Sequence, residues 1–157
     1  MDRRDVATWV SGPRAALDAA GIDLGYRGER LGLPEDGVGS ITGFGRRLGA
    51  LMIDWLASAL VALLLFPQFV YGSEQSGFAT LGVFFVMKSI CTLLGGASFG
   101  QRLLGIRVIS LDKGYVNLWR APVRTALICL LVPAVIWDRD GRGLQDRLTN
   151  TVVVRSR

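Results

Sequence analysis

The sequence contains no histidine and only two cysteines, Cys91 and Cys129. Without histidine there is no histidine-based acid–base catalysis, no axial haem ligation by histidine and almost no histidine-containing metal site. Both cysteines lie within apolar segments, which argues against a secreted disulfide scaffold and against a thiolate zinc site. We therefore expect neither a metal nor a cofactor.

Charged residues are scarce, at 20% of the chain, whereas 50% of the residues are hydrophobic. These proportions favour a membrane protein and exclude disorder throughout the chain. The formal net charge of +5 is compatible with nucleic-acid binding. However, the basic residues lie in blocks that alternate with apolar runs, the pattern that the positive-inside rule produces. We expect a lipid bilayer, and no nucleic acid, as the partner.

Residues 1–42 are mixed in character and rich in glycine. No apolar core of signal-peptide length follows the first residues, so we expect no segment to be removed on export. A short helix is predicted over residues 14–20, with Gly21 as its C-terminal cap; it either lies on the membrane surface, packs on the protein or stays unformed. Residues 26–34 are predicted to be irregular. We interpret residues 1–42 as a cytoplasmic extension.

The first long apolar run covers residues 48–70, where only Asp54 would carry a charge. At about 1.5 Å per residue such a run crosses a hydrocarbon core of about 30 Å. Arg47 and Asp54 are two helical turns apart, so they share one face, with the carboxylate about 10 Å deeper than the arginine. We predict a membrane-spanning helix that ends or kinks at Pro67 and turns this charged face away from lipid.

A second apolar run covers residues 78–97, and its only charged side chain would be Lys88. The polar turn predicted between the runs, residues 71–77, has no Lys or Arg and should face away from the cytoplasm. Small residues at the end of this run favour close helix packing, with a permeation path as the alternative: Gly95, Gly96 and Gly100. The two runs predict an antiparallel hairpin of transmembrane helices.

Two short strands are predicted in the second half of the chain. Residues 107–110 contain β-branched residues before a glycine-containing turn, which indicates a strand and a possible hairpin. Residues 151–154, Thr-Val-Val-Val, form the other strand signal. Isolated short strands are unstable in water, so we predict that these two share one ladder in the cytoplasm.

The third apolar segment, residues 122–137, leaves two interpretations open. Trp119 and Trp137 are 18 residues apart, about 27 Å in a helix, which fits one aromatic ring at each membrane interface. Against a full crossing, the segment contains Arg124, and five arginines follow it. We favour a re-entrant segment that returns the tail to the cytoplasm. The predicted fold class is an all-α membrane protein: two transmembrane helices, a third spanning or re-entrant helical segment, and a minor cytoplasmic β element.

Three motifs together resemble the RDD family of small bacterial membrane proteins. They are Arg47 with Asp54 in the first span, FGQRLLGIRV at residues 99–108, and GLQDRLTNTVVV at residues 143–154. The resemblance covers residues 43–157, which we interpret as an RDD-like transmembrane domain. It implies a multi-pass protein of the bacterial inner membrane. The distribution of Lys and Arg predicts that the N-terminus and residues 98–121 lie in the cytoplasm.

The family is named for one arginine and two aspartates, which the resemblance assigns to Arg47, Asp54 and Asp146, with Arg46 competing for the first role. The family has no general assigned activity. Some members have been proposed to move ions or solutes, and the domain also occurs as an accessory to other membrane proteins.

A carboxylate within a membrane costs about 2.5 to 3.5 kcal/mol near the centre, so Asp54 requires a partner, water or a proton. Lys88 is the first candidate. From the cytoplasmic ends of their helices, Asp54 lies about 9 Å deep and Lys88 about 13.5 Å deep, and a lysine side chain is long enough to cover this difference. Its alternative is to snorkel alone. The next candidates for Asp54 are cytoplasmic arginines, and Asp146 would pair with Arg47 or Arg46. The arginines considered for Asp54 are Arg102, Arg124 and Arg147.

These charges admit two functions. The structural interpretation is an ion pair that fixes helix packing in a non-catalytic accessory subunit, bound to other membrane proteins or to itself. The alternative is an ion or solute transporter that oligomerises around Asp54. No serine in an apolar segment has a base within a motif, so we expect no enzyme. The basic loops set topology, with binding of anionic lipid headgroups as the alternative.

Overall fold

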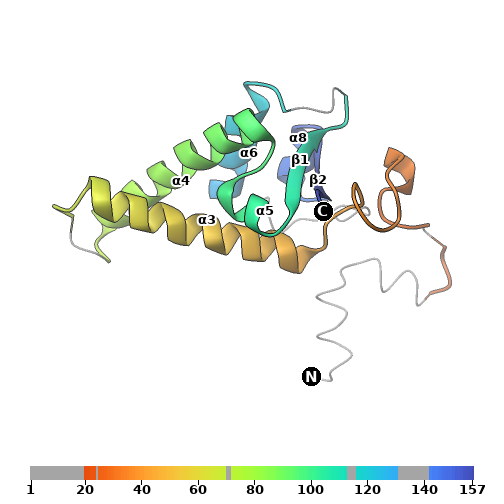
Figure 1. The fold of residues 1–157 in the computed structure, drawn as a ribbon, viewed down its shortest axis with the longest axis horizontal. Coiled ribbons are helices and arrows are strands. Elements are labelled where there is room, and N and C mark those ends of the chain that lie inside the picture. Colours follow the sequence, from red (N-terminus) through yellow and green to blue (C-terminus); the bar gives the residue numbers. More distant parts are fainter. Residues whose placement is uncertain (1–19, 24, 70–71, 113–115, 131–141) are drawn as a thin grey trace, which may run out of the picture.

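The computed structural model describes residues 20–23, 25–69, 72–112, 116–130 and 142–157. Two long helices, α3 (Phe44–Leu65) and α4 (Glu74–Gly95), approach one another at one end of the molecule and diverge toward the other (Figure 1). A group of short elements fills the space where they diverge. These short elements are α5 (Phe99–Leu103), β1 (Ile106–Ser110), α6 (Arg120–Cys129), α8 (Leu144–Leu148) and β2 (Thr151–Arg155). A further short element, η1 (Glu29–Leu31), lies beyond the sheet (Figure 1). The predicted helix over residues 14–20 lies outside the described residues, except for Ala20 in a turn.

Both long helices are apolar and long enough to cross a membrane, with 22 residues each. Only 22% of the most apolar window of α3 and 28% of that of α4 are buried inside the protein. A core helix of a soluble protein would be mostly buried, so these exposed apolar faces suit lipid. The largest exposed side chains on them include Leu56, Leu60, Leu64, Phe78 and Leu94.

The helix bounds differ from the predicted ones at the connection. Helix α3 ends at Leu65, two residues before Pro67. This is expected, because proline cannot continue a helix. Helix α4 begins at Glu74, because Ser73 caps it: the Ser73 hydroxyl accepts the backbone N–H of Ser76 at 3.3 Å. The predicted turn over residues 71–77 is therefore wrong from residue 74 onward. Polar residues there start a helix.

The two predicted strands pair in one antiparallel ladder, with Arg107 opposite Val154 and Ser110 opposite Thr151. This confirms the prediction of a shared ladder, and β1 pairs with β2 instead of forming a local hairpin. Residues 39–42 lie along the other edge of β2, where Thr42 donates its N–H to the Val153 carbonyl at 3.0 Å. Residues assigned to an extension by sequence therefore contribute backbone bonds to the sheet.

Each face of the sheet is covered. One face packs on the helices, through a cluster that includes Ala50, Val108, Ala121 and Val153. The other face packs on the segment before α3, through Ile41, Val152 and Val154 with Leu31 and Leu33 against them. Residues 26–34 are irregular apart from the single turn of η1, as predicted. The sheet thus joins this segment to the base of α3.

Only the first part of the third apolar segment is described, as α6; residues 131–137, including Trp137, lie outside the described residues. Helix α6 buries Ala121, Arg124 and Thr125, and exposes Val123. Trp119, just before it, is also exposed. The helix therefore buries a charged side chain, Arg124, while it leaves the apolar side chain of Val123 exposed, an arrangement unlike that of a soluble surface helix.

Candidate functional site: two buried charge clusters

The first cluster surrounds Asp54, which is only 1% exposed. Its Oδ2 accepts hydrogen bonds from Nζ of Lys88 at 2.6 Å and from Oγ of Ser98 at 2.5 Å. Its Oδ1 accepts the backbone N–H of Gly100 at 2.7 Å. Lys88 also donates to Ser98 at 3.2 Å and lies 5.6 Å from the centre of the Phe84 ring, a cation–π distance. Both carboxylate oxygens are therefore occupied.

A tight turn after α4 brings Ser98 and Gly100 to Asp54. Ser98 starts α5 as the first half of a capping box, and Gln101 returns the bond by accepting the Ser98 N–H at 2.9 Å. This arrangement orients the Gly100 N–H, one of the first backbone donors of α5 that lack a partner within the helix, toward the carboxylate. The Ser-Phe-Gly-Gln sequence is thus a helix start built around an anion of the same chain.

Three glycines make this turn possible, each for a different reason. A β-carbon on Gly100 would lie 2.2 Å from the Ala50 carbonyl oxygen, so α5 packs directly on the backbone of α3. Gly96 ends α4 with a φ of 65° in the left-handed region, and its carbonyl accepts the Val108 N–H at 2.6 Å. Gly95 lies under the guanidinium of Arg102.

The second cluster surrounds Asp146 on α8, which is fully buried. Nε and Nη2 of Arg124 both lie 2.8 Å from its Oδ1, and Nη1 of Arg47 lies 3.3 Å from its Oδ2. Arg47 also donates to the carbonyl of Val153 on β2 at 3.4 Å. Asp146 thereby joins α3, α6 and α8, three elements that lie far apart in the sequence.

The two clusters together bury four ionisable side chains, Asp54, Lys88, Arg124 and Asp146, and bury most of a fifth, Arg47. A buried charge is tolerated when it is paired and hydrogen-bonded, and removing one partner leaves the other uncompensated. Each carboxylate here touches an α3 residue or belongs to α3. The clusters therefore hold the short elements on one face of the first long helix.

The sequence-based pairing is confirmed for Asp54 with Lys88 and for Asp146 with Arg47. Lys88 is 3% exposed and ion-paired, so the alternative of snorkelling alone is wrong. The predicted pairing of Asp54 with an arginine is also wrong for the three candidates, Arg102, Arg124 and Arg147. Arg124 binds Asp146, Arg102 donates to the Ala97 carbonyl, and Arg147 is exposed.

Sequence reasoning missed Ser98 and the Gly100 N–H as ligands of Asp54. The signal was present, because Ser98 followed three residues later by Gln101 is a helix-start pattern. It also missed that Arg124 makes the closer contact with Asp146, because the strand pairing that returns α8 to α3 depends on contacts distant in sequence.

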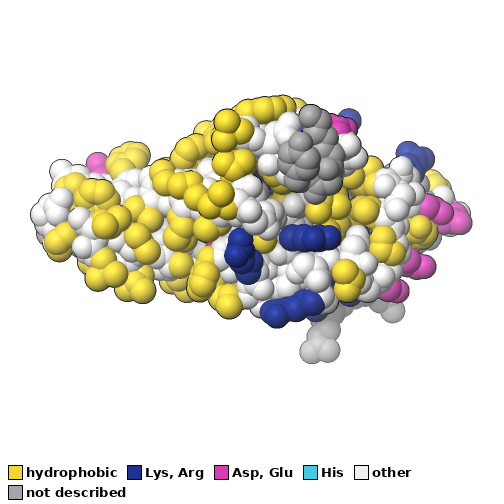
Figure 2. Space-filling view, turned by 45° about the horizontal axis from the view of Figure 1, so that its top comes forward, with side chains coloured by type: hydrophobic (Ala, Val, Ile, Leu, Met, Phe, Trp, Pro, Cys, Tyr) yellow, Lys and Arg dark blue, Asp and Glu magenta, His cyan; other side chains and the backbone are white. Residues whose placement is uncertain are grey.

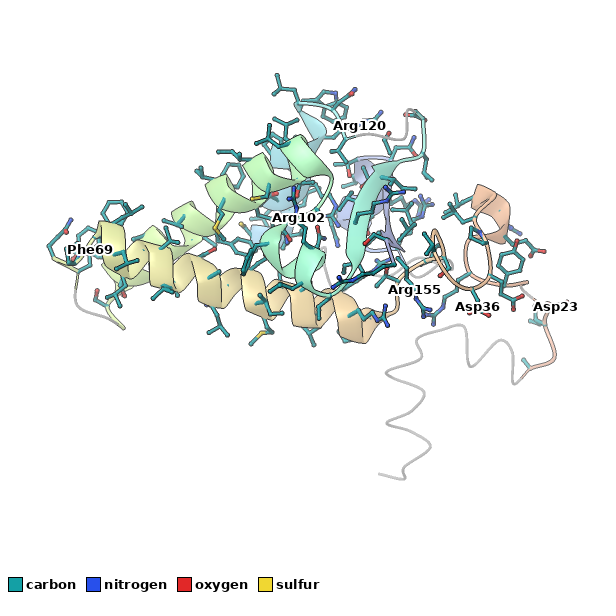
Figure 3. The ribbon with its side chains drawn as sticks, in the orientation of Figure 1. Asp23, Asp36, Phe69, Arg102, Arg120 and Arg155 are labelled. Atoms are coloured by element: carbon teal, nitrogen blue, oxygen red, sulfur yellow. The ribbon has the colours of Figure 1, made fainter. Side chains whose placement is uncertain are left out.

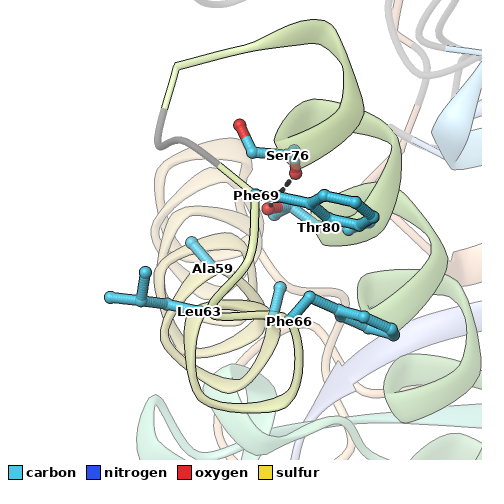
Figure 4. A pocket seen from close by; sticks show the side chains of 8 residues that line it. Ala59, Leu63, Phe66, Phe69, Ser76 and Thr80 are labelled. Atoms are coloured by element: carbon cyan, nitrogen blue, oxygen red, sulfur yellow. Dashed lines mark hydrogen bonds between the residues drawn. The ribbon is translucent and has the colours of Figure 1, made fainter.

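Two cavities of the described part of the chain are lined by neither Asp54 nor Asp146. One, between the ends of α3 and α4, measures about 10 Å³ and is lined by apolar side chains with Ser76 and Thr80 (Figure 4). Such a volume admits about one water molecule. A larger open hollow of about 450 Å³ lies beside Tyr26 and Arg155. Among the described residues, no group of three or more acidic or cysteine side chains is arranged to hold a metal.

Two apolar helices of spanning length, joined by buried ion pairs to short elements at one end, define a small helical membrane protein. The family model described as the RDD family matches residues 41–150. The chain therefore belongs to the RDD family. No curated protein and no solved structure matches the chain.

Proposed function

We propose that the chain is a non-catalytic membrane domain that packs against other membrane protein subunits or against its own copies in the bacterial cytoplasmic membrane. In this proposal Arg47, Asp54, Lys88 and Asp146 hold the fold together and bind no substrate. Partner membrane proteins would contact the exposed apolar faces of the long helices. The proposal makes the domain an accessory subunit.

The full occupation of Asp54 is the observation that carries this proposal. Its carboxylate already accepts an ammonium, a hydroxyl and a backbone N–H. A transported cation would have to displace Lys88, and the described cavities do not adjoin the carboxylate. The two long helices among the described residues are also too few to enclose a transport path.

A membrane topology follows from the same proposal. Helices α3 and α4 would cross the bilayer as an antiparallel hairpin, with their connection outside and the basic short elements in the cytoplasm, in accord with the positive-inside rule. Residues 122–137 would enter the membrane without crossing it. This is supported by the ladder of β1 with β2, because these strands precede and follow that segment and lie in one sheet.

An ion or solute transporter assembled from several copies is the second candidate. The observation that favours it is an acid in direct contact with an amine inside a spanning helix pair, an arrangement able to exchange a proton. In this alternative Asp54 would line an interface between copies.

Extraction of the full chain from its native membrane in mild detergent, followed by mass analysis of the complex, separates the two candidates. We expect a stable complex with a different membrane protein, and no cation flux from the purified chain in liposomes. A homo-oligomer whose cation flux disappears in Asp54→Asn, at unchanged folded yield, would overturn the accessory role.

Labelling of single cysteines from each side of the membrane tests the topology, in a background without Cys91 and Cys129. Glu74→Cys is expected to react only from outside, and Ser156→Cys only from the cytoplasm. Reaction of Glu74→Cys only from the cytoplasm would overturn the proposed orientation of the hairpin. Reaction of Ser156→Cys from outside would show instead that residues 122–137 cross.

A further inference from the structure

We propose that the surface around α5 binds the headgroup of an anionic phospholipid, with Arg46, Arg102 and Arg157 as its phosphate-binding side chains. The inference rests on the membrane location alone, and it holds for an accessory subunit and for a transporter alike. It concerns three arginines that neither buried cluster uses.

The molecule is banded along its length. Figure 2 shows hydrophobic side chains over the end formed by the long helices, Lys and Arg side chains gathered in the middle, and acidic side chains mainly toward the other end. A bilayer surface has the same order, from acyl chains through phosphates to water. The basic band therefore lies at the level where lipid phosphates would meet the protein.

Two of the arginines flank the end of α5. Arg46 is one helical turn before Ala50 and shares its face, and this is the face on which α5 packs through Gly100. Arg157 donates from Nη2 to the Leu103 carbonyl at 2.8 Å, and its stem lies against Gly105. Because Leu104, next to the Leu103 carbonyl that Arg157 binds, lies against Gly49, Arg157 is held close to the first turns of α3, the part of the helix that carries Arg46.

Arg102 supplies the third cation from within α5. Its guanidinium lies over Gly95, where α4 ends, and Nε donates to the Ala97 carbonyl at 3.4 Å. Figure 3 places Arg102 beside α5, in the space between the diverging long helices. The side chain is exposed, so its remaining N–H groups face outward.

Apolar side chains surround these charges and would meet the acyl chains. Phe99 is 49% exposed and Leu103 is 51% exposed, on the same short helix as Arg102. Leu48 on α3 and Leu94 on α4 continue the apolar surface toward the long helices, with exposures of 44% and 80%. A soluble anion would gain nothing from such neighbours, whereas a lipid uses both parts of the surface.

Among the described residues, no carboxylate pairs with these three arginines, as is also true of other exposed arginines such as Arg30. The hydrogen bonds of Arg102 and Arg157 go to backbone carbonyls. By contrast, Arg120 and Arg124 each bind a carboxylate. A guanidinium group that no carboxylate occupies, next to exposed apolar side chains, is suited to bind the phosphate of a lipid headgroup.

The test measures the thermal stability of the full chain in neutral detergent during titration with phosphatidylglycerol or phosphatidylcholine. We expect phosphatidylglycerol to raise the melting temperature of the natural chain more than phosphatidylcholine does. Each change among Arg46→Gln, Arg102→Gln and Arg157→Gln should weaken the apparent affinity for phosphatidylglycerol by about fivefold, the equivalent of about 1 kcal/mol. The response to phosphatidylcholine should not change.

Arg30→Gln is the matched control, because this exposed arginine lies in η1, away from α5 (Figure 1). Substitution of all three arginines by lysine should retain most of the phosphatidylglycerol response. If Arg102→Gln or Arg157→Gln does not fold, Arg46→Gln alone carries the test, since the Arg46 side chain forms no hydrogen bond with the described residues.

Three results would overturn the proposal. One is an unchanged phosphatidylglycerol response in the glutamine variants. Another is an equal loss in Arg30→Gln, which would mean that only the net charge matters. The third is equal stabilisation by inorganic phosphate, which would indicate a free anion instead of a lipid.

Discussion

Gly100 on α5 lies against Ala50 on α3 so closely that a β-carbon on the glycine would be 2.2 Å from the alanine carbonyl oxygen. Real β-carbons do not approach an oxygen so closely, so any other residue would push α5 away from α3. The same glycine donates its N–H to Asp54, and the contact therefore fixes both the packing and the ion pair.

We predict that Gly100→Ala lowers the melting temperature of the protein in detergent, because α5 must move and Asp54 loses a hydrogen bond. Gly82→Ala is the control within α4: its β-carbon would meet nothing within 4 Å, and alanine favours a helix by about 1 kcal/mol over glycine. Equal stability of the two variants would contradict the close packing of α5 on α3.

Removal of one partner of the buried Asp54–Lys88 pair should cost about 3 to 5 kcal/mol, because the other charge stays buried without compensation. We expect Asp54→Asn to lower the yield of folded protein, measured by fluorescence-detected size exclusion after heating. Asp54→Asn combined with Lys88→Met should recover part of the loss, since no lone charge remains.

The control for that pair is Asp112→Asn. Asp112 forms an ion pair with Arg120, but its side chain is 49% exposed, so the change should cost no more than about 1 kcal/mol. If the double variant were no more stable than Asp54→Asn alone, the two charges would not compensate each other.

Asp146→Asn should destabilise the protein more than Arg47→Gln. The aspartate has two cationic partners, and its loss leaves both arginines without their carboxylate, whereas loss of Arg47 leaves the closer Arg124 contact in place. Melting curves of the purified variants give the order. Arg147→Gln, an exposed change on the same short helix, serves as the control and should be nearly neutral.

Ile41→Ala should cost about 2 to 5 kcal/mol, as expected for a large-to-small change in a buried apolar cluster. Val38→Ala, at a side chain that is 62% exposed, should change the stability by no more than about 0.5 kcal/mol. Chemical or thermal unfolding in detergent measures both. A neutral Ile41→Ala would mean that the segment before α3 is not needed to cover the sheet.

The features that depend on local sequence could be predicted. The two long helices follow from uninterrupted apolar runs, and each strand follows from a short β-branched segment. The Asp54–Lys88 pairing could also be predicted, because helix rise converts position into depth and an isolated membrane charge requires a partner. The start of α4 could not be placed in this way, because Ser73 and Glu74 are equally common in turns and at helix starts.

The sequence by itself determined which residues are apolar, where the lone charges lie within the apolar runs, and which motifs place the chain in its family. Only the tertiary structure decided which carboxylate each arginine binds, that Ser98 and the Gly100 N–H complete the Asp54 site, and that residues 39–42 join the edge of β2. The physical reason is range. Helix and strand preferences act within a few residues, whereas the partner of a buried charge is set by segments as far apart as Arg47 and Asp146, which meet only after the chain has folded.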